Sequence, residues 1–247
     1  MCEWRNIMAK KIAIITARSG SKRIPKKNVK LFCGKPIIQY SIEVALESGL
    51  FSEVMVSTDS EEIAQVARKY GASVPFLRSE ATSSDFASTE DVILEVINDY
   101  KKMGKEFDYV CCIYPTAPFI DSDILNEAMC VMETRKPSVV IPMVQYSYPP
   151  QRCFIIDENG DAKFKFPEYV ATRSQDLEKQ YHDVGQFYVY NVKKLIDKKG
   201  IIVDDIAPVV ISELKAQDID TVEDWEIAEM KYKMLSMMKK EKEDGLL

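Results

Sequence analysis

Residues suited to phosphate binding gather directly after the first apolar run of the chain. Residues 12–15 are mostly β-branched and predict a buried strand, which is followed by the glycine- and serine-containing loop 17–28. Small residues in such a loop let backbone N–H groups point at an anion, while Arg18, Lys22 and Lys27 supply positive charge. Because open α/β sheets bind ligands at the carboxyl ends of their strands, this stretch predicts a polyphosphate site.

The positive charge of the chain is concentrated around this loop. Residues 4–42 contain ten Lys or Arg and no Asp or Glu, whereas the whole chain of 247 residues carries a formal charge of −6. The other 23 basic residues face 39 acidic ones, so the rest of the chain carries about −16. A charge run alone indicates only a solvated surface, but its position after a strand favours a binding site. A local basic patch in an acidic protein fits a nucleoside triphosphate and disfavours a nucleic acid.

A second pair of candidate residues, Asp218 and Asp220, lies near the C-terminus. In an extended segment two carboxylates at this spacing point to the same side, which suits Mg²⁺ shared with substrate phosphates. The alternative is a structural role at the start of the last helix, because Thr221 and Asp224 have the spacing of a capping box. Both readings stay open on spacing alone. His182 is the only histidine, so carboxylates must hold any metal.

Strands and helices alternate along the chain and must position these residues. Strands are predicted at residues 12–15, 54–59, 73–77, 108–113, 138–144, 186–191 and 208–211, and helices at 36–48, 60–70, 88–100, 121–134 and 221–240. The alternation predicts an α/β fold with a doubly wound, mostly parallel, Rossmann-like sheet. Proline and aromatic residues break the pattern over 146–180, which predicts an inserted arm that acts as a lid, a dimer contact or both. Residues 1–11 receive no role, and the tail 241–247 is expected to fray.

Length and composition favour an enzyme made of one domain over residues 1–247. With 46% apolar residues the chain can bury a large core, and no stretch reads as a membrane helix or a signal peptide, so we expect a cytoplasmic protein. Six cysteines without a C-x-x-C pair indicate reduced thiols. The phosphate-loop motif of kinases and GTPases is absent, as is the glycine motif of dinucleotide-binding oxidoreductases.

With these motifs in order, the chain resembles the acylneuraminate cytidylyltransferases, the family that makes CMP-activated sialic acids. The matching segments span nearly the whole chain and comprise residues 17–22 with Pro25, Lys27 and Asn28, then 56–59, 76–78 with Ser84 and Asp85, 115–118 and 218–221. Residues 22–25, 172–177 and 181–188 are most similar to the branch that uses pseudaminic acid. The family usually carries Gly where this chain has Arg23 and Gln where it has Tyr114, which disfavours a plain sialic acid substrate.

The resemblance implies transfer of CMP from CTP to the anomeric hydroxyl of a nine-carbon α-keto acid sugar, with release of pyrophosphate. Pseudaminic acid is the expected sugar. N-acetylneuraminic acid and legionaminic acid are the alternatives, as is a CTP-binding module without turnover. The resemblance also implies a homodimer whose arm packs on the partner subunit.

The same resemblance assigns roles to individual residues. The implied nucleotide site comprises Ala17, Arg18, Ser21, Lys22, Lys27, Asn28, Arg78, Asp85 and Ser88. The implied sugar pocket comprises Tyr114, Thr116, Arg152, Arg173 and Gln186. Catalysis is assigned to Arg18, Lys22, Asp218 and Asp220, with Mg²⁺ on the two aspartates. Taken singly, Arg78 and Asp85 are ordinary surface residues, and only the combination of motifs gives them a role.

Overall fold

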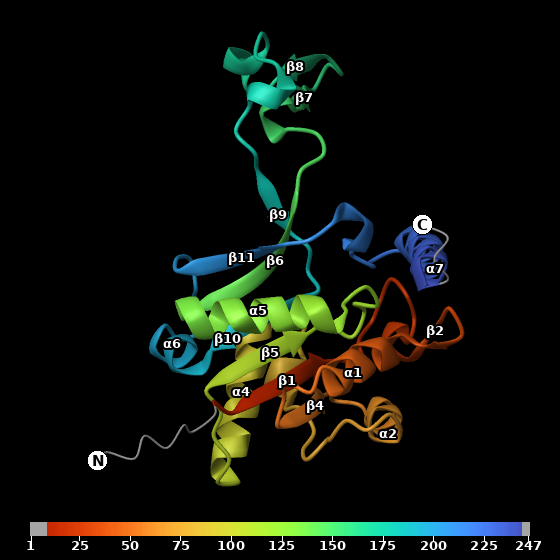
Figure 1. Cartoon of the computed structure of the whole chain (residues 1–247), viewed down its shortest axis with the longest axis vertical. Helices are drawn as coiled ribbons and strands as arrows, with labels where there is room; N and C mark the ends of the chain where they lie inside the picture. The colour runs from red at the N-terminus through yellow and green to blue at the C-terminus, as the bar shows by residue number, and fades with distance from the viewer. Residues whose placement is uncertain (1–8, 244–247) are drawn as a thin grey trace.

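A mixed β-sheet forms the centre of the computed structural model, which describes residues 9–243 (Figure 1). The sheet contains β1 (Lys11–Thr16), β4 (Glu53–Ser57), β5 (Tyr109–Ile113), β6 (Val139–Gln145), β9 (Tyr181–Asp183), β10 (Phe187–Asn191) and β11 (Ile206–Val210). Two small hairpins pair β2 (Leu31–Phe32) with β3 (Lys35–Pro36) and β7 (Phe154–Ile156) with β8 (Ala162–Phe164). The helices are α1 (Ile37–Glu47), α2 (Glu61–Lys69), α3 (Glu80–Ser83), α4 (Thr89–Lys102), α5 (Ser122–Arg135), α6 (Val192–Asp197) and α7 (Val222–Glu243).

The strands of the main path lie in the order β11-β6-β10-β5-β1-β4, with β9 paired to the end of β6. Strand β10 runs antiparallel to both of its neighbours, and the other strands of the path run in one direction. The predicted α/β class with a doubly wound, mostly parallel sheet is therefore confirmed. The carboxyl ends of β1, β4 and β5 meet at one edge, as the location of a ligand site in this class requires.

Helices cover both faces of the sheet at β1, β4 and β5, which explains why these strands are apolar and buried at nearly every position. Side chains of a strand alternate between faces, and in β1 Ile12 and Ile14 pack in the cluster with α4 and α6. Ala13 and Ile15 point the other way, into the cluster with α1, α2 and α5. Strand β1 is thus fixed from both sides, and the loop that follows it starts from a rigid base.

The predicted starts of the helices at residues 60, 88 and 221 are confirmed, and a capping residue fixes each of them. The Ser60 hydroxyl accepts from the backbone N–H of Ile63 at the start of α2, and Ser88 forms a reciprocal capping box with Asp91 at the start of α4. At the start of α7, Thr221 N–H donates to Asp224 at 2.7 Å and Asp224 N–H donates to Thr221 Oγ1 at 3.2 Å. The cap formed by Thr221 and Asp224 fixes the backbone immediately after Asp220.

Several predicted elements differ from the structure. Residues 73–77 do not form a strand, because only Ser73 bridges to Met55 before the Arg78 N–H bonds the Thr58 carbonyl and draws the chain away from the sheet. The last short strand is Ile206–Val210, two residues earlier at its start than predicted. Helix α7 continues to Glu243, three residues beyond its predicted end. Residues 1–8 and 244–247 lie outside the described residues. The short elements β2, β3, α3 and α6 carry no periodic signal and were not predicted.

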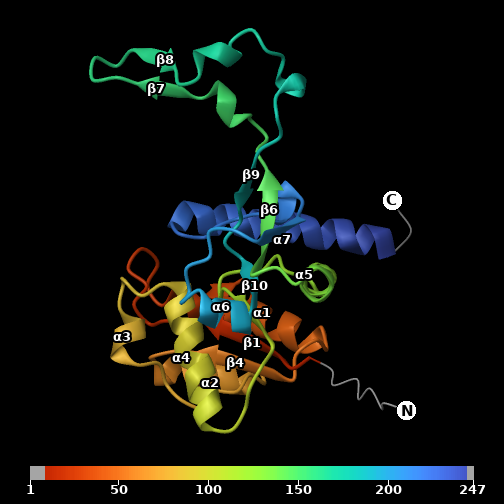
Figure 2. The ribbon, with the colours of Figure 1, turned by 90° about the vertical axis from the view of Figure 1, so that its left-hand side faces the viewer.

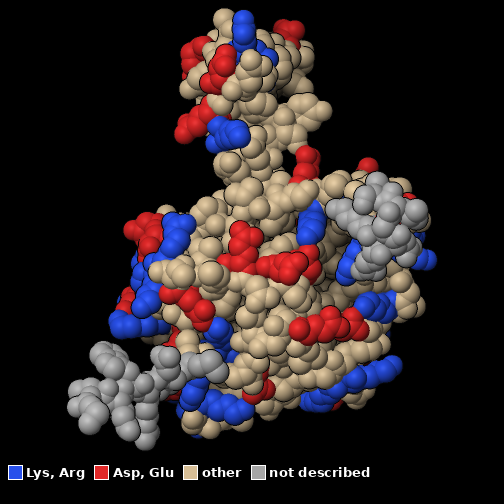
Figure 3. Space-filling view, viewed as in Figure 1, with Lys and Arg blue, Asp and Glu red and all other residues tan. Residues whose placement is uncertain are grey.

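Residues 146–180 form an arm that projects from the sheet (Figures 1 and 2). The arm contains the β7–β8 hairpin and three short 3₁₀ turns, and it is joined to the body by β6 on one side and β9 on the other. Figure 3 shows it as a distinct projection with acidic and basic side chains near its tip. None of the helices within residues 9–243 is long and apolar enough to cross a membrane.

Helix α7 is attached to the body by an aromatic cluster. The Trp225 ring contacts Phe32 edge-on at 5.5 Å between ring centroids, and Tyr232 contacts both Phe32 and Tyr40. Ile219 is fully buried in the same cluster, directly between Asp218 and Asp220. The cluster therefore determines where the two carboxylates lie.

Trp225→Ala should lower the free energy of unfolding by about 3 kcal/mol, because a large ring that is 96% buried leaves a cavity. Urea denaturation followed by circular dichroism would measure the change. Met230→Ala is the matched control on α7, since Met230 is 62% exposed, and it should change stability by less than about 0.5 kcal/mol. Equal effects of the two substitutions would contradict the anchoring role of Trp225.

Candidate active site

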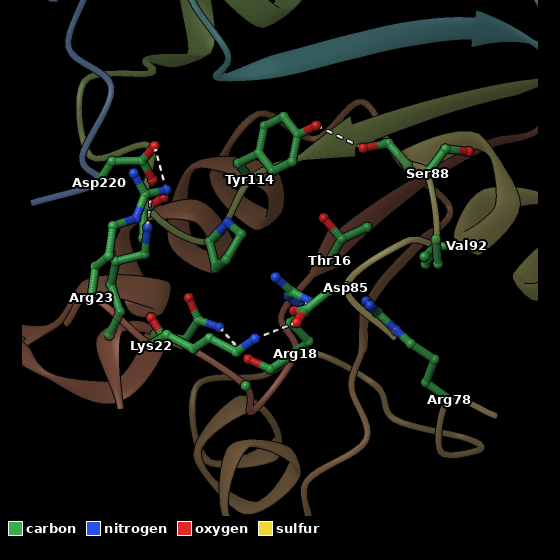
Figure 4. Close-up of a pocket in the computed structure, with 18 residues that line it drawn as sticks. Thr16, Arg18, Lys22, Arg23, Arg78, Asp85, Ser88, Val92, Tyr114 and Asp220 are labelled. Atoms are coloured by element: carbon green, nitrogen blue, oxygen red, sulfur yellow. Dashed lines mark hydrogen bonds and ion pairs between the residues drawn. The ribbon is translucent and has the colours of Figure 1, made fainter. Parts of the chain in front are cut away.

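A cleft of about 530 Å³ opens at the carboxyl ends of β1 and β5 (Figure 4). It brings together many of the residues singled out from the sequence, namely Arg18, Ser21, Lys22, Lys27, Asn28, Arg78, Asp85, Ser88, Tyr114, Thr116 and Asp220. The basic loop and Asp220 thus face one shared space, although they are far apart in the chain. Ala17, Asp218, Arg152, Arg173 and Gln186 do not line the cleft.

The basic loop is held in shape by hydrogen bonds from outside it. Asp59, just past the end of β4, accepts from both the backbone N–H and the hydroxyl of Ser19, at 2.7 and 2.6 Å. The buried Asn28 side chain donates to the Arg18 carbonyl at 2.9 Å. Ala17 is fully buried and its N–H donates to the Ser57 carbonyl, so it extends the sheet instead of facing the cleft. These contacts preorganise the loop for a ligand.

Arg18 and Lys22 share one carboxylate partner, Asp85. The Arg18 guanidinium lies 2.6 Å from Asp85 Oδ1, and the Lys22 ammonium lies 2.5 Å from Oδ2. Hydrogen bonds from Lys22 and Arg18 lower the pKa of Asp85 below its ordinary value. A triphosphate bound at the same cations must replace Asp85 as their partner, and the exposure of these side chains makes that exchange inexpensive.

Arg78 is less exposed than the cleft cations Arg18, Lys22 and Arg23. Its Nε donates to the Ser57 hydroxyl at 3.1 Å and its Nη2 donates to the Ser57 carbonyl at 2.8 Å. Burial lowers the pKa of Arg78, but a guanidinium stays protonated in proteins. The side chain is therefore a fixed positive charge at the wall of the cleft, with further N–H groups free to bind a ligand (Figure 4).

Asp220 forms the wall opposite Arg18 and Arg78 (Figure 4). Its Oδ2 lies 2.7 Å from Arg23 Nη2, and its Oδ1 lies 3.4 Å from Lys27 Nζ. Lys27 also donates to the Ile219 carbonyl at 2.6 Å, which ties the aspartate segment to the basic loop.

Asp220 lines the cleft and Asp218, two residues earlier and exposed, does not, so only one of the two predicted carboxylates faces the shared space. Together the two side chains still have the chemistry of a site for a divalent cation completed by substrate oxygens. Desolvation and the nearby Asp220 charge raise the pKa of Asp218, because both disfavour its ionised form. Among residues 9–243 no cluster of three or more Cys, His, Asp or Glu could hold a metal by itself. Two carboxylates fit Mg²⁺, which is usually bound by one or two carboxylates together with phosphates and water.

The residues assigned to a sugar pocket separate into two groups. The Tyr114 hydroxyl is hydrogen-bonded to Thr89 Oγ1 at 2.7 Å, and burial raises the pKa of Tyr114 to about 12. Thr116 lines the same cleft. Gln186 is buried and supports Tyr114 through its backbone carbonyl, which accepts from the Tyr114 N–H at 2.9 Å. Gln186 therefore contacts a residue that lines the cleft but does not line the cleft itself.

Arg152 and Arg173 lie in the arm. Arg152 donates to the carbonyls of Val170 and Thr172 at 3.2 and 2.9 Å, so it stabilises the fold of the arm. Arg173 is exposed beside the short turn at Ser174–Asp176. Neither arginine lines the cleft of its own chain.

Several cleft residues were not singled out from the sequence, among them Thr16, Arg23, Thr89, Val92 and Pro115. Arg23 lies within the basic loop and Thr16 ends β1, so their positions could have identified them. Thr89 and Val92 belong to the first turn of α4, and nothing in the local sequence indicates that this turn faces the cleft. Asp59 was also missed, although it follows a strand.

Comparisons with known proteins find similar sequences and folds. The sequence profile of a family described as Cytidylyltransferase matches residues 12–147. The pseudaminic acid cytidylyltransferase of Campylobacter jejuni subsp. jejuni serotype O:2 is 41% identical over 91% of this chain and 97% of its own length. The CMP-N,N'-diacetyllegionaminic acid synthase of Legionella pneumophila subsp. pneumophila is 35% identical over 88% of this chain and 94% of its own length.

A solved structure with a similar fold is a CMP:2-keto-3-deoxy-manno-octonic acid synthetase complexed with CTP. The two folds superpose with a TM-score of 0.67 over 94% of this chain and 100% of the other, at 20% sequence identity. The 4-diphosphocytidyl-2C-methyl-D-erythritol synthase of Anaerococcus prevotii superposes with a TM-score of 0.60, over 91% of this chain and 99% of the other, at 16% identity. These two structures support the fold.

Proposed function

The chain belongs to the cytidylyltransferase family, and we propose that it transfers CMP from CTP to the anomeric hydroxyl of pseudaminic acid, with release of pyrophosphate. The observation that carries this proposal is the single cleft in which the cations Arg18 and Lys22 face the carboxylate of Asp220. The 41% identity to a pseudaminic acid cytidylyltransferase supports the choice of sugar.

The basic loop binds the triphosphate in this proposal. Arg18 and Lys22 exchange Asp85 for phosphate oxygens, and the preorganised loop offers the Ser21 hydroxyl and backbone N–H groups beside them. Arg78, fixed by Ser57, and Ser88, at the start of α4, complete the nucleotide site on the same side of the cleft. Lys27 and Asn28 mainly position the loop, through the carbonyls of Ile219 and Arg18.

The reaction is an in-line displacement at the α-phosphorus of CTP. The anomeric oxygen of the sugar forms a bond to this phosphorus, the bond to the oxygen bridging toward the β-phosphorus breaks, and the proton of the sugar hydroxyl passes to solvent water. Negative charge increases on the leaving pyrophosphate, where Arg18 and Lys22 stabilise it. Tyr114 and Thr116 form the wall on which the sugar is oriented.

Asp218 and Asp220 would hold a Mg²⁺ ion in this proposal. The ion would act as a Lewis acid toward a phosphoryl oxygen, which lowers the cost of the developing charge. Ile219, buried between the two aspartates, fixes the segment that presents them.

We further propose a homodimer of single nucleotidyltransferase domains spanning residues 1–247, with 146–180 as the inserted arm. The arm exposes large apolar side chains that a second copy of the chain can cover, among them Tyr148, Phe154 and Ile156. A partner arm would also bring Arg152 and Arg173 within reach of a cleft.

We expect the protein to work in the cytoplasm, where CTP is available. The free thiols of five cysteines fit a reducing compartment, namely Cys33, Cys111, Cys112, Cys130 and Cys153. Cell fractionation would check this location.

Pyrophosphate release with CTP and Mg²⁺ should be fastest with pseudaminic acid among the acidic sugars. A coupled assay with pseudaminic, legionaminic and N-acetylneuraminic acid, each at the same concentration, measures the preference as kcat/KM. A higher value for either of the other two sugars would reassign the substrate. No release with any of the three would favour a CTP-binding module without turnover.

Lys22→Ala should lower kcat by about a hundredfold, because loss of one charge-assisted donor to the leaving pyrophosphate costs about 3 kcal/mol of barrier. Initial rates at saturating CTP and sugar would measure it. Lys26→Gln is the matched control, since it removes one charge from the same loop but its partner, Glu62, lies outside the cleft. A near-normal rate for Lys22→Ala would contradict its assigned role.

Ile156→Asp should shift the protein from dimer toward monomer, because it places a charge on an apolar arm residue that is 72% exposed in one chain. Sedimentation velocity at several protein concentrations would show the change. Ile201→Asp is the control, since Ile201 is equally exposed, at 71%, but belongs to the body. A monomeric wild type would disprove the homodimer.

A further inference from the structure

We propose that Arg23 holds Asp220 when no metal ion does, and that it turns to the phosphates of the substrate once a metal ion binds Asp220. Arg23 would then couple the binding of the metal to the binding of the triphosphate. This inference rests on the proposed function, because it takes Asp220 as a metal-binding residue and CTP as the substrate.

The two cations that contact Asp220 are attached to the protein in different ways. Lys27 is mostly buried, with 18% of its side chain exposed, and it is also bound to the Ile219 carbonyl. Arg23 is 64% exposed, and its one polar partner within residues 9–243 is Asp220 Oδ2, at 2.7 Å. Lys27 is therefore a fixed part of the wall, whereas Arg23 is free to leave at little cost.

An exposed ion pair of this kind is weak, and a divalent cation can replace it. Ion pairs between exposed side chains contribute little because water and salt screen them, and Asp220 is itself 40% exposed. A guanidinium and a Mg²⁺ ion cannot both approach the same carboxylate oxygen without strong repulsion. Binding of the metal at Asp220 therefore expels Arg23 from its present partner.

The freed Arg23 has a second anion within the same cleft. Arg23 follows Lys22 in the basic loop, and both residues line the cleft (Figure 4). A guanidinium binds phosphate oxygens through two parallel hydrogen bonds, which an ammonium cannot do. A triphosphate bound at Lys22 thus offers phosphate oxygens to Arg23 when the metal ion takes Asp220. Binding of the metal therefore raises the affinity for the triphosphate, and binding of the triphosphate raises the affinity for the metal by the same factor.

The first test measures metal affinity without substrate, with Mn²⁺ alone as the probe and electron paramagnetic resonance as the readout. Arg23→Ala should tighten Mn²⁺ binding by about two- to fivefold, because the competitor for Asp220 is gone. Lys26→Gln, which removes a charge from the same loop without touching Asp220, should leave the affinity unchanged. Unchanged or weaker binding by Arg23→Ala would overturn the exchange.

Asp220→Asn separates this inference from the proposed function in the same titration. If Asp220→Asn weakens Mn²⁺ binding but Arg23→Ala does not tighten it, the metal site stands and the exchange is wrong. If Asp220→Asn leaves the affinity unchanged, Asp220 is not a metal-binding residue, and both the metal site and the exchange are wrong.

The second test measures CTP affinity by calorimetry, once with a chelator and once with Mg²⁺. Arg23→Ala should weaken CTP binding more with Mg²⁺ than with the chelator, by a further factor of about three or more, because only the metal frees Arg23 for the phosphates. Lys26→Gln should show the same small effect in both conditions. An equal penalty for Arg23→Ala in both conditions would overturn the coupling.

Discussion

The cleft depends on one long-range contact, in which Lys27 donates a hydrogen bond to the carbonyl of Ile219, 192 residues further along the chain. This bond joins the cationic loop after β1 to the segment that carries Asp218 and Asp220. Burial of Ile219 and Trp225 under the β2–β3 hairpin holds the same segment from the other side. Without these contacts the basic loop and Asp220 would belong to independent surfaces, and no shared cleft would form between them.

Opposite charges inside this cleft are paired in a way that still permits binding. Asp85 balances Arg18 and Lys22, while Arg23 balances Asp220, and all of these pairs are partly exposed. Arg78 and Lys27, in contrast, are tied to backbone carbonyls by short hydrogen bonds. The site thus combines fixed charges, which define its shape, with exchangeable pairs that lower the cost of the empty cleft.

Much of this arrangement could be predicted from the sequence because local signals carry it. The strand before Arg18, the Ser88 capping box and the Thr221–Asp224 cap all follow from short patterns that the structure confirms. Contacts between segments that are far apart in the sequence leave no such local pattern. The approach of Thr89 to Tyr114, the burial of Gln186 behind the cleft and the antiparallel course of β10 depend on which segments become neighbours. Resemblance alone can also point to residues outside the cleft. Arg152 and Arg173 were assigned to the sugar pocket by resemblance, but they lie in the arm and do not line the cleft.

Strand β9, at the base of the arm, is connected to the cleft through two aromatic rings, those of Tyr188 and Tyr114. Asp183, the last residue of β9, accepts a hydrogen bond from the Tyr188 hydroxyl, and the Tyr188 ring meets Tyr114 edge-on at 5.8 Å. The arm is therefore not a module that can be exchanged at any point between related enzymes. A chimaera that grafts a foreign arm keeps this ring contact only if its junctions lie outward of Gln145 and Tyr181, so that the host chain retains β6 and β9.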